Sequence, residues 1–379
     1  MRVFFDNAAT TPLDAEVMKV MTDVMHQAYG NPSSIHFEGR QAKTIIEKAR
    51  KSIAGMLGVT PGEIFFTSGG TEADNMAITC SVRDLGVKHI ITSKIEHHAV
   101  LHTVEEMEKQ GVHLDYVNLL PDGHIDLSHL EELLSDTSHG KTLVSLMHAN
   151  NEIGNILDIE KVGEMCKKHN AYFHSDTVQT VGHVPLKLRE WGVHFAASAG
   201  HKFNGPKGVG FIFINNDVKI RPFISGGAQE RNMRGGTENI IGIAGIAKAL
   251  EIAYAEMDQQ HEHISSIRNY VIEKLKEEIP GITFNGDYEG RCSYTVVSAN
   301  VPPSPAAEML LFNLDIEGIA ASGGSACTSG SSQGSHVLRE LHPVEGSAPM
   351  RLSFGKYNTR AEVDFFIAKL KEILKLVHA

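Results

Sequence analysis

Two residues that follow neighbouring apolar runs suggest a specific cofactor chemistry. Asp176 ends a stretch that begins with the run at 171–173, and Lys202 comes just after the run at 195–197. A lysine amine can form a Schiff base with the aldehyde of pyridoxal phosphate (PLP). An aspartate can keep the pyridine nitrogen of that cofactor protonated, so that the ring absorbs the electrons of a carbanion. The pair therefore predicts a PLP site but does not indicate which reaction takes place there.

The scaffold that positions these residues is predicted from a series of short apolar runs. Most are separated by helical patterns, which indicates an α/β fold with a mainly parallel sheet of seven strands covered by helices on both faces. Ligands of such sheets bind at the carboxyl ends of the strands, where both residues fall. The runs lie at 64–67, 89–92, 114–118, 143–147, 171–174, 195–198 and 210–214.

Two domains are expected, because 379 residues exceed the usual size of a single hydrophobic core. We predict a large domain at 14–258 that carries the sheet. A smaller α+β domain would combine 1–13 with 259–379. Its expected elements are helices at 261–278, 306–313 and 360–377 and strands near 295–299 and 316–321.

The charge balance limits the partners. With 35 basic and 46 acidic residues the formal net charge is −11, which disfavours nucleic acid or an anionic membrane as the main partner. No run of 18 apolar residues occurs, and the chain turns polar after its first five residues, which is unlike a signal peptide. We therefore expect a cytoplasmic enzyme.

The four cysteines form no C-x-x-C pair, which argues against a disulfide framework and a zinc site of that kind. Cys166 shares a helical stripe with apolar residues, and Cys80 and Cys292 adjoin regular elements, so all three are expected to be structural. Cys327 differs, because its loop at 322–335 holds almost no apolar residues. An accessible sulfur in a polar loop is typical of a nucleophile.

Two glycine-rich stretches are candidates for phosphate binding. The stretch at 68–72 follows a predicted strand and opens a predicted helix, whose free amides can bind phosphate. The stretch at 234–237 offers further amides and the hydroxyl of Thr237. Without a ligand, the first would be an ordinary capped turn and the second a glycine loop without function.

Three further motifs carry candidate side chains. The pair His97 and His98 offers an imidazole that can stack on a flat ring and assist proton transfer, although a lone histidine is more often structural. Asn151 can hydrogen-bond a phenolic oxygen, or it can simply favour a turn. Arg351 lies in a short predicted strand and could bind a carboxylate, or it could be an arginine on an exposed edge.

Together these stretches resemble the cysteine desulfurases of the NifS/IscS group, within the class V aminotransferase family of fold type I PLP enzymes. The resemblance covers essentially the whole chain, and the long loop around Cys327 looks like that of the NifS/IscS subgroup. The motifs in order are DNAATTP, YGNPSS, SGGTEADN, EHHAV, HANNEIG, SDTVQTVG, GHKFNGPKG, MRGGTEN, SACTSG and RLSFGKYNT.

The resemblance implies a role for each candidate residue. Lys202 would be the Schiff-base lysine, Asp176 would pair with the pyridinium nitrogen, and Cys327 would receive sulfur from L-cysteine as a persulfide. The product would be L-alanine, and the sulfur would pass to an acceptor such as an iron–sulfur cluster scaffold. The other implied contacts are His97 stacked on the ring; Asn151 and Gln179 at the phenolic oxygen; Gly70, Thr71 and His201 at the phosphate; Thr237 at the phosphate from the second subunit of a homodimer; and Asn31 and Arg351 at the substrate carboxylate.

The lysine motif departs from the family pattern at one position. The family commonly has a serine three residues before the lysine, whereas this chain has Ala199 there and Ser198 one residue earlier. Either Ser198 supplies the hydroxyl to the phosphate, or one hydrogen bond of about 1 kcal/mol is missing.

Other functions remain open on the sequence alone. A selenocysteine lyase or another class V aminotransferase-type enzyme would use a similar site. A sulfur-carrying protein without turnover would use Cys327 alone and would not need Lys202. A metal hydrolase built on His97, His98 and Asp176 is a further hypothesis.

Overall fold

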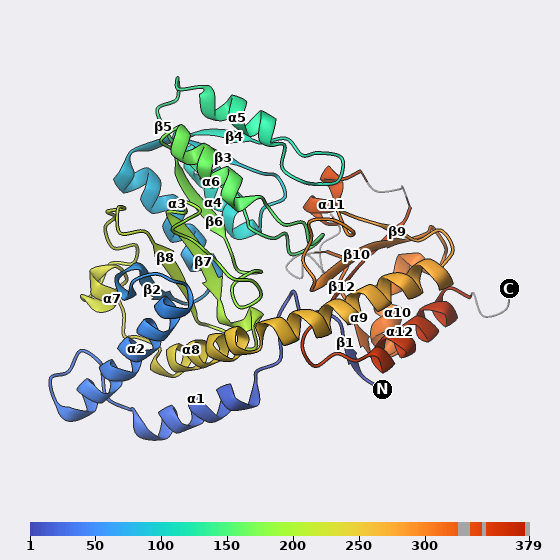
Figure 1. Ribbon diagram of the computed structural model, residues 1–379, viewed down its shortest axis with the longest axis horizontal. Coiled ribbons are helices and arrows are strands. Elements are labelled where there is room, and N and C mark those ends of the chain that lie inside the picture. Colours follow the sequence, from blue (N-terminus) through green and yellow to red (C-terminus); the bar gives the residue numbers. More distant parts are fainter. Residues whose placement is uncertain (325–333, 343–345, 376–379) are drawn as a thin grey trace.

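The computed structural model describes residues 1–324, 334–342 and 346–375, and its main feature is a seven-stranded sheet (Figure 1). The strand order is β2-β8-β7-β6-β5-β3-β4, and every neighbouring pair from β7 to β4 is parallel. Strand β8 runs antiparallel to both of its neighbours. The predicted mainly parallel sheet is therefore confirmed. The strands are β2 (Ile64–Thr67), β3 (Val87–Thr92), β4 (His113–Tyr116), β5 (Lys141–Ser145), β6 (Tyr172–Asp176), β7 (Phe195–Ala199) and β8 (Gly210–Ile214).

Helices cover both faces of this sheet, so its central strands are buried on both sides. In β8, Phe211 and Phe213 belong to a core shared with helices α2, α5, α6 and α8, whereas Ile212 packs with α3 on the opposite face. This explains why the strand is apolar throughout rather than alternating. The helices are α1 (Ala15–Gln27), α2 (Phe37–Met56), α3 (Gly70–Leu85), α4 (His98–Lys109), α5 (Leu127–Ser135), α6 (Ile159–Lys168), the short α7 (Gln229–Asn232) and α8 (Ile240–Ala255).

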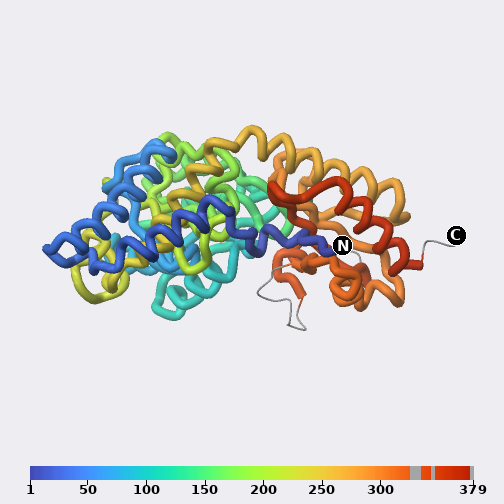
Figure 2. Tube along the Cα trace, turned by 90° about the horizontal axis from the view of Figure 1, so that it is seen from below, coloured from blue at the N-terminus to red at the C-terminus, as the bar shows by residue number. Residues whose placement is uncertain are grey.

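A second hydrophobic core lies in the C-terminal part of the chain. It is built on an antiparallel sheet of order β12-β10-β9, and Val3 and Phe5 from the N-terminus join it. Figure 2 shows the N-terminal trace crossing from the large sheet's side to this body. The elements are β1 (Val3–Phe4), α9 (Met257–Glu278), β9 (Thr283–Phe284), β10 (Val296–Val301), α10 (Leu310–Ile316), β11 (Ile319–Ala320), α11 (His336–Glu340), β12 (Ala348–Ser353) and α12 (Arg360–Ile373).

One predicted strand in this body is shorter than expected. Helix α10 continues to Ile316, and Gly318 then adopts a φ of +83°, a left-handed conformation that ends the helix. Only Ile319 and Ala320 remain to form β11, which pairs in parallel with β1. The apolar run at 316–321 is therefore shared between a helix end and a two-residue strand.

Local signals explain where several helices begin. Asp14 caps α1 by accepting a hydrogen bond from the Glu16 amide at 2.8 Å, and Thr359 and Glu362 form a reciprocal capping box at α12. Among the described helices, none combines the length and apolar character that a membrane crossing requires.

Candidate cofactor site

A cavity of about 230 Å³ lies where β6 and β7 end and α3 begins. It is the kind of position in which open α/β sheets bind ligands. The chain reaches it from several distant segments, including the N-terminus and β12. Its lining is Ala8, Ala9, Gly70, Thr71, Asp74, His97, Met147, Asn151, Asp176, Val178, Gln179, Ala199, His201, Lys202 and Arg351.

Asp176, the last residue of β6, presents a buried carboxylate to this cavity. It is only 6% exposed, and its Oδ1 accepts a hydrogen bond from the Val178 amide at 2.9 Å. Burial raises the pKa of Asp176, while the charges of His97 and Lys202 act in the opposite direction. A cationic group in the cavity would favour the ionised carboxylate, and a protonated pyridine nitrogen is such a group.

His97 is the residue before α4 and caps that helix. Its Nδ1 accepts a hydrogen bond from the Ala99 amide at 3.1 Å, so the neutral ring carries its proton on Nε2. Burial lowers the pKa of His97 despite the nearby charge of Asp176. A neutral imidazole with a fixed orientation is suited to lie against a planar ring.

Lys202 ends the short 3₁₀ turn Gly200–Lys202 that follows β7. Its Nζ donates hydrogen bonds to the carbonyl oxygens of Ala8 at 2.5 Å and Ala9 at 3.0 Å. Gln179 also donates to the Ala8 carbonyl, at 3.1 Å. The N-terminal segment therefore positions the lysine amine at the cavity wall.

The first turn of α3 lies at the cavity, where the sequence predicts that a phosphate binds. Gly70 and Thr71 lie in that turn and line the cavity, and the helix is 16 residues long, so its free amides and dipole favour a phosphate. A Cβ added at Gly70 would lie 2.6 Å from Val178 Cγ2, so only glycine fits there without a shift. His201 Nδ1 is buried and has no hydrogen-bond partner within the described residues.

These groups fit PLP by their chemistry. The cavity offers an amine for its aldehyde, a carboxylate for its ring nitrogen, an imidazole beside the ring and helix amides for its phosphate. The unpartnered His201 nitrogen, which also lines the cavity, is a further group that a phosphate could satisfy.

Arg351 enters the same cavity from β12 in the second body. It is 2% exposed, and it donates to the Asn151 carbonyl at 3.0 Å and to Asp6 Oδ1 at 2.7 Å. The predicted strand position of Arg351 is confirmed. A guanidinium in this place could meet the carboxylate of a small amino acid.

Three predicted residues do not line the cavity. Asn31 is exposed, and its Oδ1 accepts a hydrogen bond from the Ser33 amide at 2.9 Å. Thr237 is exposed and lines a separate cavity of about 160 Å³ with Ser68 and Arg234. Ser198 is the third predicted residue that does not line the cavity. Cys327 lies outside the residues that the structure describes.

Ser198 and Ala199 face opposite sides of the sheet, because successive side chains in a strand alternate. Ala199 lines the cavity, whereas Ser198 is fully buried and its hydroxyl has no hydrogen-bond partner within the described residues. The placement of Ser198 therefore gives no support to the expectation that its hydroxyl replaces the missing one.

Sequence reasoning missed Asp74, which lies on α3 one turn after Gly70. It is 1% exposed, and burial raises its pKa well above the usual range, with the charge of Asp176 adding to the effect. The i, i+4 spacing from Gly70 is the signal that could have placed it on the cavity side of the helix.

The three cysteines within the described residues do not line the cavity. Cys80 and Cys166 are buried, as expected, and Cys292 is half-buried. Burial raises the pKa of all three thiols, which keeps them in the unreactive protonated form.

A metal ion could in principle use part of the same cavity. Asp74, His97 and Asp176 place three ligand atoms within 4.8 Å of one another, but His98 is not part of that group. The metal-hydrolase hypothesis would thus compete with PLP for the same cavity.

Comparisons with known proteins show the family of this chain. The family model described as aminotransferase class-V matches residues 3–366. The cysteine desulfurase IscS of Dictyoglomus turgidum is 42% identical over 380 residues, covering 98% of this chain and 94% of the relative. A solved structure of a NifS-like protein superposes with a TM-score of 0.91 at 37% identity and covers both chains completely. A structure of SspA in complex with cysteine has a TM-score of 0.81 at 29% identity, covering 95% of this chain and all of that one.

The fold and the site define a fold type I PLP-dependent enzyme. The matches extend over nearly the whole chain and include both hydrophobic cores. The chain belongs to the aminotransferase class-V family and, within it, to the cysteine desulfurases.

Proposed function

We propose that this cavity carries out the PLP-dependent removal of sulfur from L-cysteine, with L-alanine as the product and Cys327 as the first acceptor of the sulfur. The observation that carries the proposal is that Lys202, Asp176 and His97 line one cavity, although they come from three different segments. The relatives named cysteine desulfurase and the SspA complex with cysteine support the choice of substrate.

Lys202 is proposed to anchor the cofactor and then to move a proton. When bound, PLP supplies a conjugated ring that accepts the electrons left by removal of the substrate Cα proton. Nζ of Lys202, once released from covalent attachment, takes that proton as a general base. Asp176 would keep the proton on the ring nitrogen, and the His97 imidazole would lie against the ring.

Arg351 is proposed to bind the substrate carboxylate. Its guanidinium is already oriented by Asn151 and Asp6, so little side-chain entropy is lost when the substrate arrives. Asn31 would add a second contact, although it is exposed and outside the cavity of its own chain.

The sulfur step is proposed to take place at Cys327. Its thiolate attacks the sulfur of the bound cysteine, so that a new S–S bond forms and the Cβ–S bond breaks. The electron pair of the broken bond stays on the carbon fragment, which gains a proton at Cβ and leaves as L-alanine. The overall change is that L-cysteine and an enzyme thiol give L-alanine and an enzyme persulfide.

The attachment of the loop that holds Cys327 supports this assignment. On one side, the Ser322 amide donates to the Arg351 carbonyl at 3.2 Å. On the other side, Ser335 Oγ donates to Glu152 Oε2 at 2.5 Å, next to Asn151. Cys327 is five residues from Ser322, a span of at most roughly 17 Å for an extended chain. Ser322 and Ser335, which flank Cys327 in the chain, are thus both held beside the cavity.

A homodimer is proposed because Thr237 lies outside the cavity of its own chain. Its exposed hydroxyl would reach the phosphate of a second copy. Exposed apolar side chains on and between α1 and α2 offer surface that such a contact would bury. They are Met18, Met25, Tyr29, Ile35 and Phe37. Light scattering coupled to gel filtration would measure the mass, and a monomer would contradict this part of the proposal.

The proposed domain division follows the two cores. Residues 14–258 would form the large domain, and 1–13 with 259–379 the small one. Support comes from the separate hydrophobic clusters and from Glu256, which lies between the end of α8 and the start of α9. The cavity would then lie between domains, and an acceptor such as an iron–sulfur scaffold would approach the loop at 322–335.

Borohydride trapping tests the enzyme proposal. Reduction of the purified yellow protein should fix PLP on Lys202, which peptide mass spectrometry would locate. The Lys202→Ala variant should show no such adduct, while Lys207→Ala, an exposed lysine five residues on, should retain it. A colourless protein, or an adduct at another lysine, would refute the proposed role of Lys202.

A further inference from the structure

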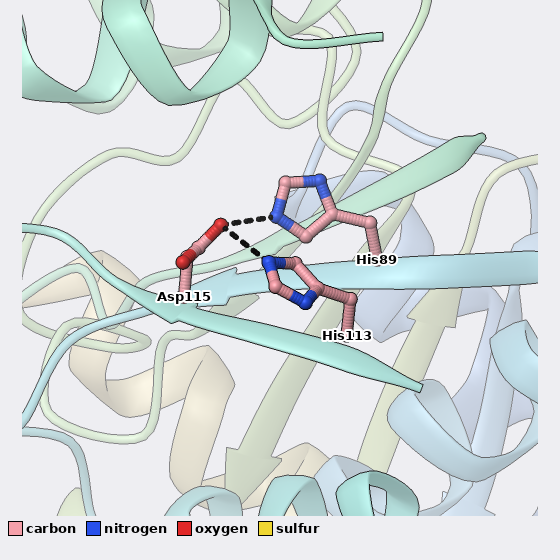
Figure 3. A group of neighbouring side chains, drawn as sticks. All are labelled: His89, His113 and Asp115. Carbon is pink, nitrogen blue, oxygen red and sulfur yellow. Dashed lines mark hydrogen bonds and ion pairs between the residues drawn. The ribbon is translucent and has the colours of Figure 1, made fainter. Parts of the chain in front are cut away.

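A second group of chemically competent side chains lies at a different place in the sheet. His89 on β3 pairs in register with His113 on β4, and Asp115 comes two residues after His113. Residues two apart in a strand share a face, so the three side chains meet on one side of the sheet (Figure 3). Strand β4 is an edge strand of the large sheet. The group lies toward the amino ends of β3 and β4, whereas the cofactor cavity lies at the carboxyl ends of β6 and β7.

The three side chains converge on a single carboxylate oxygen. Asp115 Oδ2 lies 2.9 Å from His89 Nε2 and 3.3 Å from His113 Nε2. The three ligand atoms lie within 4.8 Å of one another. In tetrahedral zinc sites with bonds of 2.0–2.2 Å, ligand atoms lie roughly 3.3 Å apart. Shifts of a few tenths of an ångström in the side chains would therefore accommodate an ion.

The environment of His89 adds an independent argument. Its side chain is 1% exposed, and its Nδ1 lies 3.2 Å from Thr142 Oγ1 on β5. The Thr142 hydroxyl in turn donates to the Gly140 carbonyl at 3.4 Å. A Thr142 hydroxyl that donates to this carbonyl can accept a hydrogen bond from Nδ1 of His89. In that tautomer the lone pair of Nε2 faces the Asp115 carboxylate, an arrangement that a cation bound between the two groups would stabilise.

A third histidine, His139, lies against this group. The centroid of the His139 ring lies 5.2 Å from that of the His89 ring. The His139 ring stacks on the His113 ring with centroids 3.6 Å apart. The group therefore gathers three imidazoles beside one carboxylate, and imidazole nitrogens are common metal ligands.

We propose that His89, His113 and Asp115 bind a divalent transition-metal ion of the Zn²⁺ class, with water in the remaining coordination position. Two imidazoles and one carboxylate form a ligand set that suits zinc. Thr142 orients His89 through the hydrogen bond to Nδ1, as outer residues commonly do for metal-binding histidines. The ion would link edge strand β4 to β3 and would have no part in the chemistry at Lys202.

Equilibrium dialysis of the PLP-bound protein against Zn²⁺ tests this site. All proteins would carry Cys327→Ser, so that the loop thiol cannot bind the metal. The parent protein should bind one more Zn²⁺ per chain than the His113→Asn variant, with only nitrogen and oxygen ligands in the X-ray absorption spectrum of that ion. Thr142→Val should weaken binding about ten- to a hundred-fold. His26→Asn, which changes an exposed histidine on α1, should bind like the parent.

Two results would overturn the proposal. One is equal zinc binding by the parent and the His113→Asn variant, and the other is no binding by the parent. Either would mean that the three side chains form a proton-sharing hydrogen-bonded group. Zn²⁺ should also raise the thermal midpoint of the parent but not that of His113→Asn. In the absence of metal, His113→Asn should contain as much PLP as the parent, which would show that the variant is folded.

Discussion

Arg351 donates from Nη2 to a carboxylate oxygen of Asp6 at 2.7 Å, although the two residues are 345 positions apart in the chain. The pair joins the N-terminal motif to β12 at the edge of the cofactor cavity. A buried guanidinium needs such a partner, because an unpaired charge away from water is unstable. Asp6 therefore compensates the charge of Arg351 and orients its guanidinium before any substrate is present.

The first prediction concerns substrate binding by Arg351. Arg351→Lys should raise the KM for L-cysteine by about ten- to a hundred-fold, since a lysine cannot reproduce the planar fork that meets a carboxylate. The PLP absorbance band should persist. Steady-state alanine formation measures the effect, with Arg360→Lys on the exposed start of α12 as the control. An unchanged KM would remove Arg351 from substrate binding.

The second prediction separates Ala199 from Ser198. Ala199→Ser places a hydroxyl on the cavity side of β7 and should tighten PLP binding by about five-fold, the equivalent of one hydrogen bond of about 1 kcal/mol. Ser198→Ala should leave PLP affinity unchanged, because that side chain is on the other face. Reconstitution of the PLP-free protein measures both affinities. The opposite pattern would mean that Ser198 contacts the phosphate.

The third prediction concerns the buried pair of Arg50 and Glu230. Two hydrogen bonds of 2.8 Å join them, and both side chains are 2% exposed. Arg50→Leu should cost about 3–5 kcal/mol of stability, because Glu230 would keep a buried charge without its partner. Arg231→Leu, which removes an exposed pair with Glu47, should cost less than about 1 kcal/mol. Similar thermal midpoints for the two variants would contradict this.

The fourth prediction concerns Glu96, which is 1% exposed and accepts hydrogen bonds from the Met147 amide and the Ser93 hydroxyl. Burial raises the pKa of Glu96 from 4.5 to about 8. The folded state therefore holds this proton more tightly than the unfolded state. The resulting stabilisation is complete below pH 4.5 and is lost as the pH rises through 8.

Glu96→Gln should remove that dependence, because the amide imitates the neutral acid. Between about pH 5.5 and about pH 8 the parent should lose up to about 3 kcal/mol more stability than the variant. Thermal midpoints at the two pH values measure this, with the exposed Glu105→Gln on α4 as control. Parallel pH profiles for the parent and Glu96→Gln would show that Glu96 is ionised in the folded protein.

Much of the large sheet could be predicted from the sequence, because strands buried on both faces appear as isolated apolar runs. The runs at 64–67 and 210–214 match β2 and β8 completely. Prediction was weaker where one apolar run served two elements, as at 316–321. There the left-handed turn at Gly318, rather than the apolar pattern, decides where the helix stops.

The placement of Asp176 and Lys202 in one cavity could be predicted, because each lies at or just after the end of a strand. The contacts of Lys202 with the Ala8 and Ala9 carbonyls were not predictable, because backbone groups leave no signature in residue type. The metal-binding group was missed for another reason. His89 and His113 are 24 positions apart, and only the register of β3 and β4 brings them together.

The most direct test is a single-turnover reaction of the PLP-bound enzyme with L-cysteine in the absence of reductant. Alanine would be quantified, and the protein would be mapped by mass spectrometry. The parent enzyme should form alanine together with one extra sulfur atom on Cys327, and Cys327→Ala should form almost no alanine while keeping its PLP band. Alanine formation by Cys327→Ala at the parent rate, or added sulfur on Cys80, Cys166 or Cys292 instead, would contradict it.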